Sequence, residues 1–70
     1  MTAASNILSA REKEVLLWLI KGKANGEIGI ILDVSEYTVK NHVSAIMRKF
    51  NASNRQQVVA IALSTGMIES

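Results

Sequence analysis

Between residues 37 and 48, polar side chains recur at a helical spacing and offer groups that hydrogen bond to another molecule. The set consists of Tyr37, Asn41, Ser44 and Arg48. At about 100° per residue, these positions fall on one face of a helix. They supply a phenol, a carboxamide, a hydroxyl and a guanidinium, which are donors, acceptors and one positive charge. The spacing indicates a binding surface, and the alternative from these residues alone is a solvated face of a small helical bundle.

The residue types needed for catalysis or metal binding are scarce in this sequence. It contains one histidine, His42, and no cysteine, so neither a multi-histidine nor a thiolate metal site can form. Gly22, Gly26 and Gly29 lack the Gly-Lys-Ser/Thr ending of a phosphate loop and follow a helical pattern rather than a strand. We therefore expect no enzyme activity, no metal and no cofactor, and a structural or phosphate-facing role for His42.

Positive charge is concentrated in one part of the chain. Among 70 residues, 8 Lys and Arg stand against 6 Asp and Glu, which gives a net charge of +2. Residues 36–55 carry four of these cations and one acid, whereas residues 1–35 are balanced. Hydrophobic residues make up 49% of the chain, as in a folded domain, but so short a chain buries only a modest core. Helix packing or a partner must stabilise it.

Neither a membrane span nor a secretory signal is predicted. The longest apolar run, residues 15–20, has six residues, whereas a membrane-spanning helix needs about 20. Residues 1–6 lack the charged start and the apolar stretch of a secretory signal. We interpret residues 1–7 as a linker or tail and expect the protein to be cytoplasmic, without a membrane partner.

Four helices are predicted, and the first of them has signals at both ends. Ser9 and Glu12 have the spacing of a capping box, in which each side chain hydrogen bonds to the backbone of the other residue. Lys21 suits the last turn of this helix, and Gly22 can adopt the left-handed conformation that ends it. The first helix is therefore expected between Ser9 and Gly22.

The second predicted helix is short. Asn25 is its expected N-cap, and residues 33–34 are the expected break before the next helix. Its expected apolar face consists of Ile28, Ile31 and Leu32. Gly26 and Gly29 lower its helix propensity, each by about 1 kcal/mol relative to Ala.

The third and fourth predicted helices follow without a long connection. Ser35 is a good N-cap for the third, whose apolar stripe lies nearly opposite the polar set. This stripe consists of Val39, Val43, Ile46 and Phe50. The fourth helix is expected to begin at Ser53 or Asn54 and to end at Gly66, and its core face consists of Val58, Ile61 and Ala62. Trp18, Met47 and Phe50 are expected in the core or an interface.

A short helix, a tight break and a longer basic helix is the plan of a helix-turn-helix. The chain also resembles the LuxR-type, or GerE-type, DNA-binding domain from residue 8 to about residue 68. The matching motifs are Leu8-Ser9-x-Arg11-Glu12-x-Glu14-Val15-Leu16, Gly22-x-x-Asn25-x-Glu27-Ile28, Leu32-x-Val34-Ser35-x-x-Thr38-Val39-Lys40-x-His42, Ile46-x-x-Lys49-Phe50 and Asn54-Arg55. Trp18 with Gly22-Lys23 is most similar to the output domains of acyl-homoserine-lactone receptors. Gly26, Gly29 and Asn51-Ala52 depart from the family pattern.

The resemblance implies an all-α domain of four helices over residues 8–68, with the helix-turn-helix at about residues 25–50. It implies sequence-specific binding to duplex DNA as the output domain of a bacterial transcription regulator, with the third helix in the major groove. It also implies an upstream ligand-sensing or phospho-acceptor domain outside this chain, although some family members consist of the DNA-binding domain alone, and it implies association with the nucleoid when bound. An acid of the first helix, Glu12 or Glu14, is expected to pair with Arg55. RNA polymerase is a second candidate partner.

The predicted DNA contacts divide between bases and phosphates. Asn41 suits an adenine edge, Lys40 suits guanine acceptors, and Ser44 is short enough to permit close approach. The hydroxyl residues at the start of the third helix suit phosphates. Arg48 suits a phosphate or a base, and Lys49 is expected to contact a phosphate or to be solvated. The full predicted set is Ser35, Tyr37, Thr38, Lys40, Asn41, Ser44, Arg48 and Lys49.

The fourth helix carries more apolar residues than one core face needs. Val59 and Leu63 lie beside that face at a spacing of four residues, and an apolar strip left over on a small domain indicates a partner. We predict that both residues line a weak two-fold dimer contact, so that two copies bind an inverted repeat. The alternative is a helical interaction or dimerisation module that does not bind DNA, and salt-sensitive DNA binding distinguishes the two.

Overall fold

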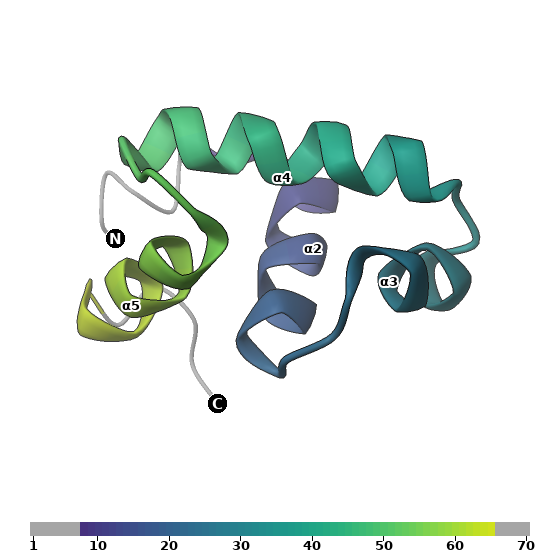
Figure 1. Cartoon of the computed structure of the whole chain (residues 1–70), viewed down its shortest axis with the longest axis horizontal. Coiled ribbons are helices and arrows are strands. Elements are labelled where there is room, and N and C mark those ends of the chain that lie inside the picture. Colours follow the sequence, from purple (N-terminus) through teal and green to yellow (C-terminus); the bar gives the residue numbers. More distant parts are fainter. Residues whose placement is uncertain (1–7, 66–70) are drawn as a thin grey trace.

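The computed structural model describes residues 8–65, which form four helices and no strand, as Figure 1 shows. The helices are α2 (Ala10–Ile20), α3 (Asn25–Leu32), α4 (Glu36–Phe50) and α5 (Arg55–Thr65). The longest helix, α4, lies along one side of the molecule, and the other three lie beneath it (Figure 1). The predicted all-α fold is confirmed. The predicted tail at residues 1–7, the helix end at Gly66 and the last predicted domain residues lie outside the described range.

The capping box predicted at the start of α2 is present. The Ser9 hydroxyl accepts a hydrogen bond from the Glu12 N–H at 3.1 Å. In return, the Ser9 N–H donates to Glu12 Oε1 at 2.9 Å, so two otherwise unpaired backbone donors are satisfied. At the other end, Gly22 has φ +86°, the left-handed conformation expected of it. The prediction for the first helix is therefore confirmed at both ends.

The start of α3 differs from the prediction. The N-cap is Ala24, and Asn25 is the first helical residue. Ala24 has no side-chain acceptor, and its N–H donates instead to Glu27 Oε1 at 2.8 Å. The prediction was wrong because the Asn25 carboxamide oxygen accepts a hydrogen bond from Arg55 and is not used as a cap.

The apolar face of α3 is narrower than predicted. Ile28 is fully buried and Leu32 packs against the core, but 43% of Ile31 is exposed. Ile28 and Leu32 are four residues apart and share one face, whereas Ile31 lies at its edge. Its neighbour Ile30 is 83% exposed. The helix therefore buries one ridge only, against α4.

A tight turn joins α3 to α4. Asp33 ends α3 in the left-handed conformation, with φ 60°, and Ser35 then caps α4. The Val34 N–H donates to the Gly29 carbonyl at 2.9 Å and folds the chain back on α3. A Cβ on Gly29 would lie 2.7 Å from the Val34 carbonyl oxygen, whereas a Cβ on Gly26 would meet only the Glu36 side chain, at 3.5 Å. The break expected at residues 33–34 is confirmed.

The two glycines of α3 are expected to respond in opposite directions to alanine. Gly26→Ala should raise the free energy of unfolding by about 0.5–1 kcal/mol, because alanine loses less backbone entropy in a helix. Gly29→Ala gains the same propensity but forces a backbone overlap that costs about 1–3 kcal/mol, so a net loss is expected. Thermal unfolding of both variants measures the difference. Equal stabilisation by both would show that the backbone of the turn moves away from the new methyl group without a cost in stability.

The core lies between α2 and α4 and is closed by α3 and α5. The buried apolar residues are Leu8, Val15, Leu16, Leu19, Ile28, Val39, Val43, Ile46, Val58 and Ala62. Trp18, Met47 and Phe50 are partly buried and pack against this core, as predicted. Three members of the predicted stripe of α4 are therefore buried and the fourth, Phe50, borders them. Ile61, predicted for the core face of α5, is half-buried.

Candidate nucleic-acid interface

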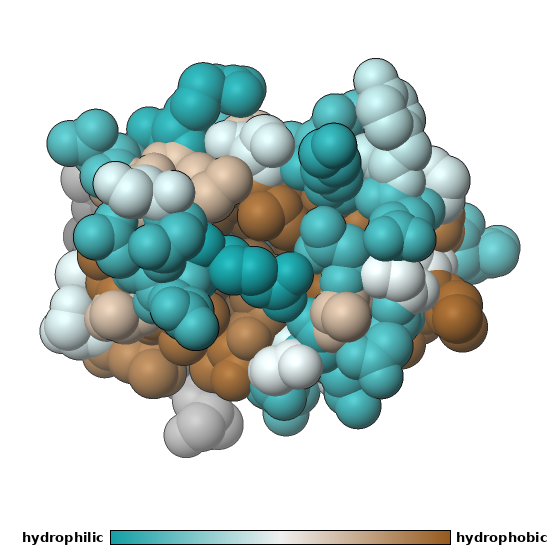
Figure 2. All heavy atoms as spheres, in the orientation of Figure 1, coloured by the Kyte–Doolittle hydropathy of each residue, from teal (hydrophilic) through white to brown (hydrophobic). Residues whose placement is uncertain are grey.

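The outer face of α4 carries the polar set that the sequence predicts. Tyr37, Asn41 and Arg48 are exposed, and Ser44 is half-buried. Val39 and Ile46 on the opposite side are fully buried, so the rotation of α4 about its axis is fixed by the core. No other described helix covers the outer face, and Figure 2 shows mostly hydrophilic side chains along this edge of the molecule. The structure therefore presents these groups together on a rigid element.

Two hydroxyl residues lie at the start of α4. The Ser35 hydroxyl accepts a hydrogen bond from the Thr38 N–H at 3.0 Å and donates one to Thr38 Oγ1 at 2.9 Å. Ser35 is thus the cap that the sequence predicts. Because Thr38 Oγ1 accepts in this pair, the hydrogen of its own hydroxyl can be donated to another acceptor.

The outer face of α4 is positively charged. Lys40 and Arg48 are both exposed, and neither forms an ion pair with any residue in the range 8–65. Arg48 lies in the last turn, where the negative end of the helix dipole favours a cation. The only acid of α4 is Glu36 in its first turn. Of the four cations in residues 36–55, Lys40 and Arg48 therefore lie on the uncovered side of α4.

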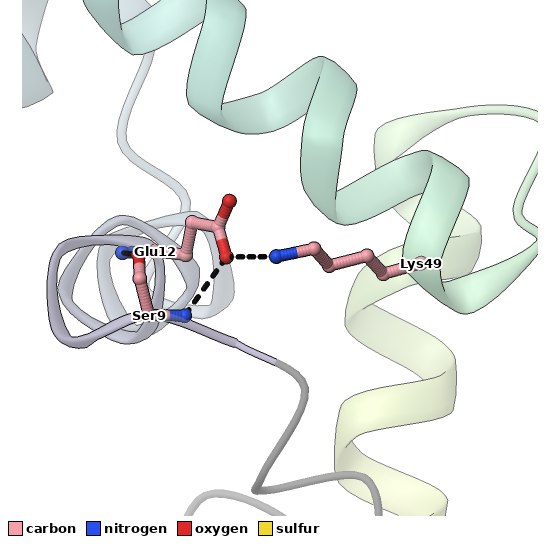
Figure 3. Close-up of polar contacts among 3 residues, drawn as sticks. All are labelled: Ser9, Glu12 and Lys49. Atoms are coloured by element: carbon pink, nitrogen blue, oxygen red, sulfur yellow. Dashed lines mark hydrogen bonds and ion pairs between the residues drawn. The ribbon is translucent and has the colours of Figure 1, made fainter.

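Lys49 behaves differently from the other cations of α4. Its ammonium lies 2.7 Å from Oε1 of Glu12, which is buried with 7% of its surface exposed. Figure 3 shows Lys49 extending from α4 toward α2 and the Ser9–Glu12 capping box. The sequence grouped Lys49 with the DNA contacts, but the structure gives it this partner inside the domain. Its position next to the apolar stripe, about 60° from Ile46 around the helix, was the available signal.

The predicted pairing of Arg55 with an acid of α2 is wrong. Glu12 pairs with Lys49, and Glu14 pairs with Arg11 at 3.3 Å. Arg55 instead donates to the carboxamide oxygen of Asn25 at 3.0 Å and to the Lys23 carbonyl at 2.6 Å. Its guanidinium therefore joins the start of α5 to the α2–α3 connection. These acceptors are neutral, and the first acid of α2 is already taken by a closer cation.

The carboxyl group of Glu12 is held in its charged form. Burial raises its pKa. Hydrogen bonds from Lys49 and from the Ser9 N–H, together with the charges of Lys49 and His42, lower the pKa by more than burial raises it, so it lies below its ordinary value. The ionised Glu12 carboxylate therefore stabilises the folded domain. This stabilisation is complete at a pH above the pKa of Glu12 in the unfolded chain, and it is lost as the pH falls through the pKa of Glu12 in the folded domain.

Acid is therefore expected to destabilise the domain partly through Glu12. The melting temperature should fall as the pH is lowered from about 5 toward 3, because protonation removes the ion pair with Lys49. Glu12→Gln keeps a capping-box acceptor but cannot titrate, so its melting temperature should fall less over the same range. Thermal unfolding at several pH values compares the two, and parallel curves would show that Glu12 makes no such contribution.

Residues 8–65 contain neither a cluster of metal-binding side chains nor a membrane-spanning helix. His42 is half-buried, and no group of three His, Cys, Asp or Glu residues is placed there to hold a metal ion. None of the four described helices is long and apolar enough to cross a membrane. An open hollow beside α3 is lined partly by Glu27, Asp33 and Glu36, whose negative charges make it unsuited to a polyanion.

A short helix held by a tight turn against a longer helix with an uncovered basic face defines a helix-turn-helix protein. Residues 6–62 match the family model described as bacterial regulatory proteins, luxR family, and the chain belongs to that family of DNA-binding transcription regulators. The match includes all of α2, α3 and α4 and the first part of α5.

Relatives and a solved structure agree with this assignment. The chain is 46% identical over 68 residues to the regulatory protein SdiA of Escherichia coli, covering 97% of this chain and 28% of that protein. It is 48% identical over 61 residues to the quorum-sensing regulator RhlR of Pseudomonas aeruginosa, covering 87% of this chain and 25% of that protein. The structure of the transcription factor GerE superimposes with a TM-score of 0.81 at 34% identity, covering 89% of this chain and 92% of that one. The chain thus spans under a third of each of these two longer regulators.

Proposed function

We propose that α4 enters the major groove of duplex DNA and that its outer face reads the sequence. The observation that carries the proposal is the exposed face of α4, where Lys40 and Arg48 form no ion pair with the described residues and the carboxamide of Asn41 is exposed beside them. An α-helix fits the width of the major groove, and each base pair presents a distinct pattern of donors and acceptors there. The buried stripe on the other side of α4 holds the helix rigidly for this task.

Within this face, we assign base contacts to the first half of α4. The carboxamide of Asn41 can donate to and accept from one adenine edge, and the Lys40 ammonium can reach guanine acceptors. Ser44 lies one turn further along, and its half-buried hydroxyl allows the helix to approach the bases closely. These three residues would supply the sequence preference, because contacts to base edges carry the sequence information.

Phosphate contacts would supply most of the affinity. We assign them to Ser35 and Thr38 at the start of α4, to the 72% exposed Tyr37 and to Arg48 near its end. The backbone N–H groups of the first turn and the positive end of the helix dipole favour a phosphate at Ser35 and Thr38. These contacts fix the register of the protein on DNA without reading its sequence.

We infer that two copies bind an inverted repeat through α5. Leu63 is 59% exposed, although its neighbour Ala62 is fully buried, and Val59 is half-buried at the edge of the core. An isologous contact through these residues would place the two α4 helices in successive major grooves, about 34 Å apart. The isolated domain should dimerise weakly, because in the longer relatives we expect the rest of the protein to contribute a larger share of the dimer interface.

A charge placed at Leu63 should therefore weaken self-association. Leu63→Asp would bury two carboxylates across the two-fold contact, and we expect the dissociation constant to rise at least about tenfold. Ser64→Asp is the matched control, because it adds the same charge about 100° away around α5. Sedimentation equilibrium measures both, and an unchanged constant for Leu63→Asp would remove this residue from the interface.

The longer relatives also support a view of the whole protein. We infer that this chain is the output part of a cytoplasmic regulator whose remaining part senses a signal. The relative RhlR supports this inference, because it is named a quorum-sensing regulator and this chain covers only 25% of its length. On DNA it would be associated with the nucleoid. We propose RNA polymerase as a second partner.

Methylation interference tests the placement of α4 in the major groove. Dimethyl sulfate methylates guanine N7 in the major groove and adenine N3 in the minor groove. We expect guanine N7 methylation within the half-sites to abolish binding and adenine N3 methylation to have little effect. The reverse pattern would contradict the proposal. Absence of DNA binding by a folded chain would favour the helical interaction module instead.

A further inference from the structure

One buried carboxylate joins the start of α2 to the end of α4. Oε1 of Glu12 accepts a hydrogen bond from the Ser9 N–H at 2.9 Å and another from the Lys49 ammonium at 2.7 Å. Only 7% of Glu12 is exposed, and Figure 3 shows both donors meeting the same oxygen. The other ion pair within residues 8–65, Arg11–Glu14, is local to α2. Glu12–Lys49 is therefore the one described ion pair that links two helices.

The direction of Lys49 follows from this pair. Lys49 lies about 100° around α4 from Arg48, on the flank between the outer face and the core. Its side chain is 37% exposed, so the ammonium is within reach of solvent and is held at α2 by Glu12 alone among the described residues. A lysine released from Glu12 has a long flexible stem and would place its charge beside Arg48.

We propose that Glu12 is a positioning residue for DNA recognition, which withholds the charge of Lys49 from the DNA backbone and fixes the last turn of α4. The proposal rests on DNA binding by the outer face of α4. A mobile cation beside Arg48 would contact phosphates on any sequence, whereas a fixed one leaves the base contacts of the first half of α4 to decide affinity. Glu12 thereby favours specific over non-specific binding.

The salt dependence of binding counts the cations that reach phosphates. Each neutralised phosphate contributes about 0.9 to the slope of log K against log salt concentration. Lys49→Met keeps most of the stem and should leave the slope unchanged, because Lys49 is occupied by Glu12. Arg48→Met, its matched control one residue away, should make the slope shallower by about 0.9.

Removal of the Glu12 charge should reverse this result. Glu12→Gln keeps an acceptor for the Ser9 N–H, so the capping box and the fold are retained while Lys49 loses the negative charge that holds it at α2. We expect its slope to steepen by about 0.9 and the double variant Glu12→Gln/Lys49→Met to return to the original value. A purely structural role for the pair would change stability in these variants without changing the slope.

The experiment is a salt titration of the full chain on a random-sequence duplex, with circular dichroism as the check that each variant is folded. The expected result is an unchanged slope for Lys49→Met and a steeper slope for Glu12→Gln. In the double variant Glu12→Gln/Lys49→Met, the slope should return to that of the original chain. A slope that becomes shallower for Lys49→Met alone would show that Lys49 already contacts phosphate, and an unchanged slope for Glu12→Gln would equally overturn the proposal. Absence of binding by the unmodified chain would instead contradict the proposed function.

Discussion

Replacement of Asn41 by alanine should abolish most of the preference of this domain for its own site. Asn41 is exposed on the outer face of α4, in the half of the helix that we propose to enter the major groove first. Loss of a bidentate contact to one base costs roughly 1–3 kcal/mol, or about 5- to 150-fold in the dissociation constant. On random DNA, where that contact is not made, the affinity should change little. Fluorescence anisotropy on both duplexes measures the two effects separately.

Arg48→Ala provides the contrast for Asn41. As a phosphate contact, Arg48 should contribute to both duplexes alike, so its removal should weaken specific and random binding by a similar factor. If Asn41→Ala also weakened both duplexes equally, Asn41 would contact the backbone and not a base. The side chain that reads the sequence would then have to be sought elsewhere on α4, first at Lys40.

Ile46→Ala should have the largest effect on stability. Ile46 is fully buried where α4 meets the core, and truncation of such a residue costs about 2–5 kcal/mol in the free energy of unfolding. In a domain of this size, each 1 kcal/mol lowers the melting temperature by about 4–8 °C. The variant should therefore be largely unfolded under conditions in which the original chain is folded, and DNA binding should be lost with the fold.

Ile30→Ala is the matched control for this prediction. Ile30 has the same side chain on the neighbouring helix α3, but 83% of it is exposed. Its truncation should change the free energy of unfolding by less than about 0.5 kcal/mol. Thermal unfolding compares the two variants, and similar losses at Ile46 and Ile30 would contradict the assignment of the core.

Local signals in the sequence predicted most of the helices. The Ser9–Glu12 capping box and the Ser35 cap act over three residues, and both are present at 3.1 Å and 3.0 Å. The two stripes of α4 depend only on the period of the helix, and burial of Val39 and Ile46 opposite the exposed Asn41 confirms them. Short-range chemistry was sufficient in each of these cases.

Contacts between distant residues account for the differences. Asn25 has the residue type of an N-cap, but Arg55, 30 residues away, takes its carboxamide oxygen. Lys49 has the charge of a DNA contact, and its contact with Glu12, 37 residues away, could not be read from the sequence. Ile31 has the spacing of a core residue, but α3 is short and buries one ridge only. Each outcome depends on which helices contact one another in the folded domain. The residue types alone do not predict these contacts.

We expect the outer face of α4 to bind duplex DNA in a sequence-dependent way. Fluorescence anisotropy of this chain with a labelled library of inverted-repeat duplexes, at two salt concentrations, measures this binding. We predict selective binding that weakens steeply with salt, because several cations displace counterions from the phosphates. Absence of binding at low salt, with the helical circular dichroism intact, would contradict this expectation.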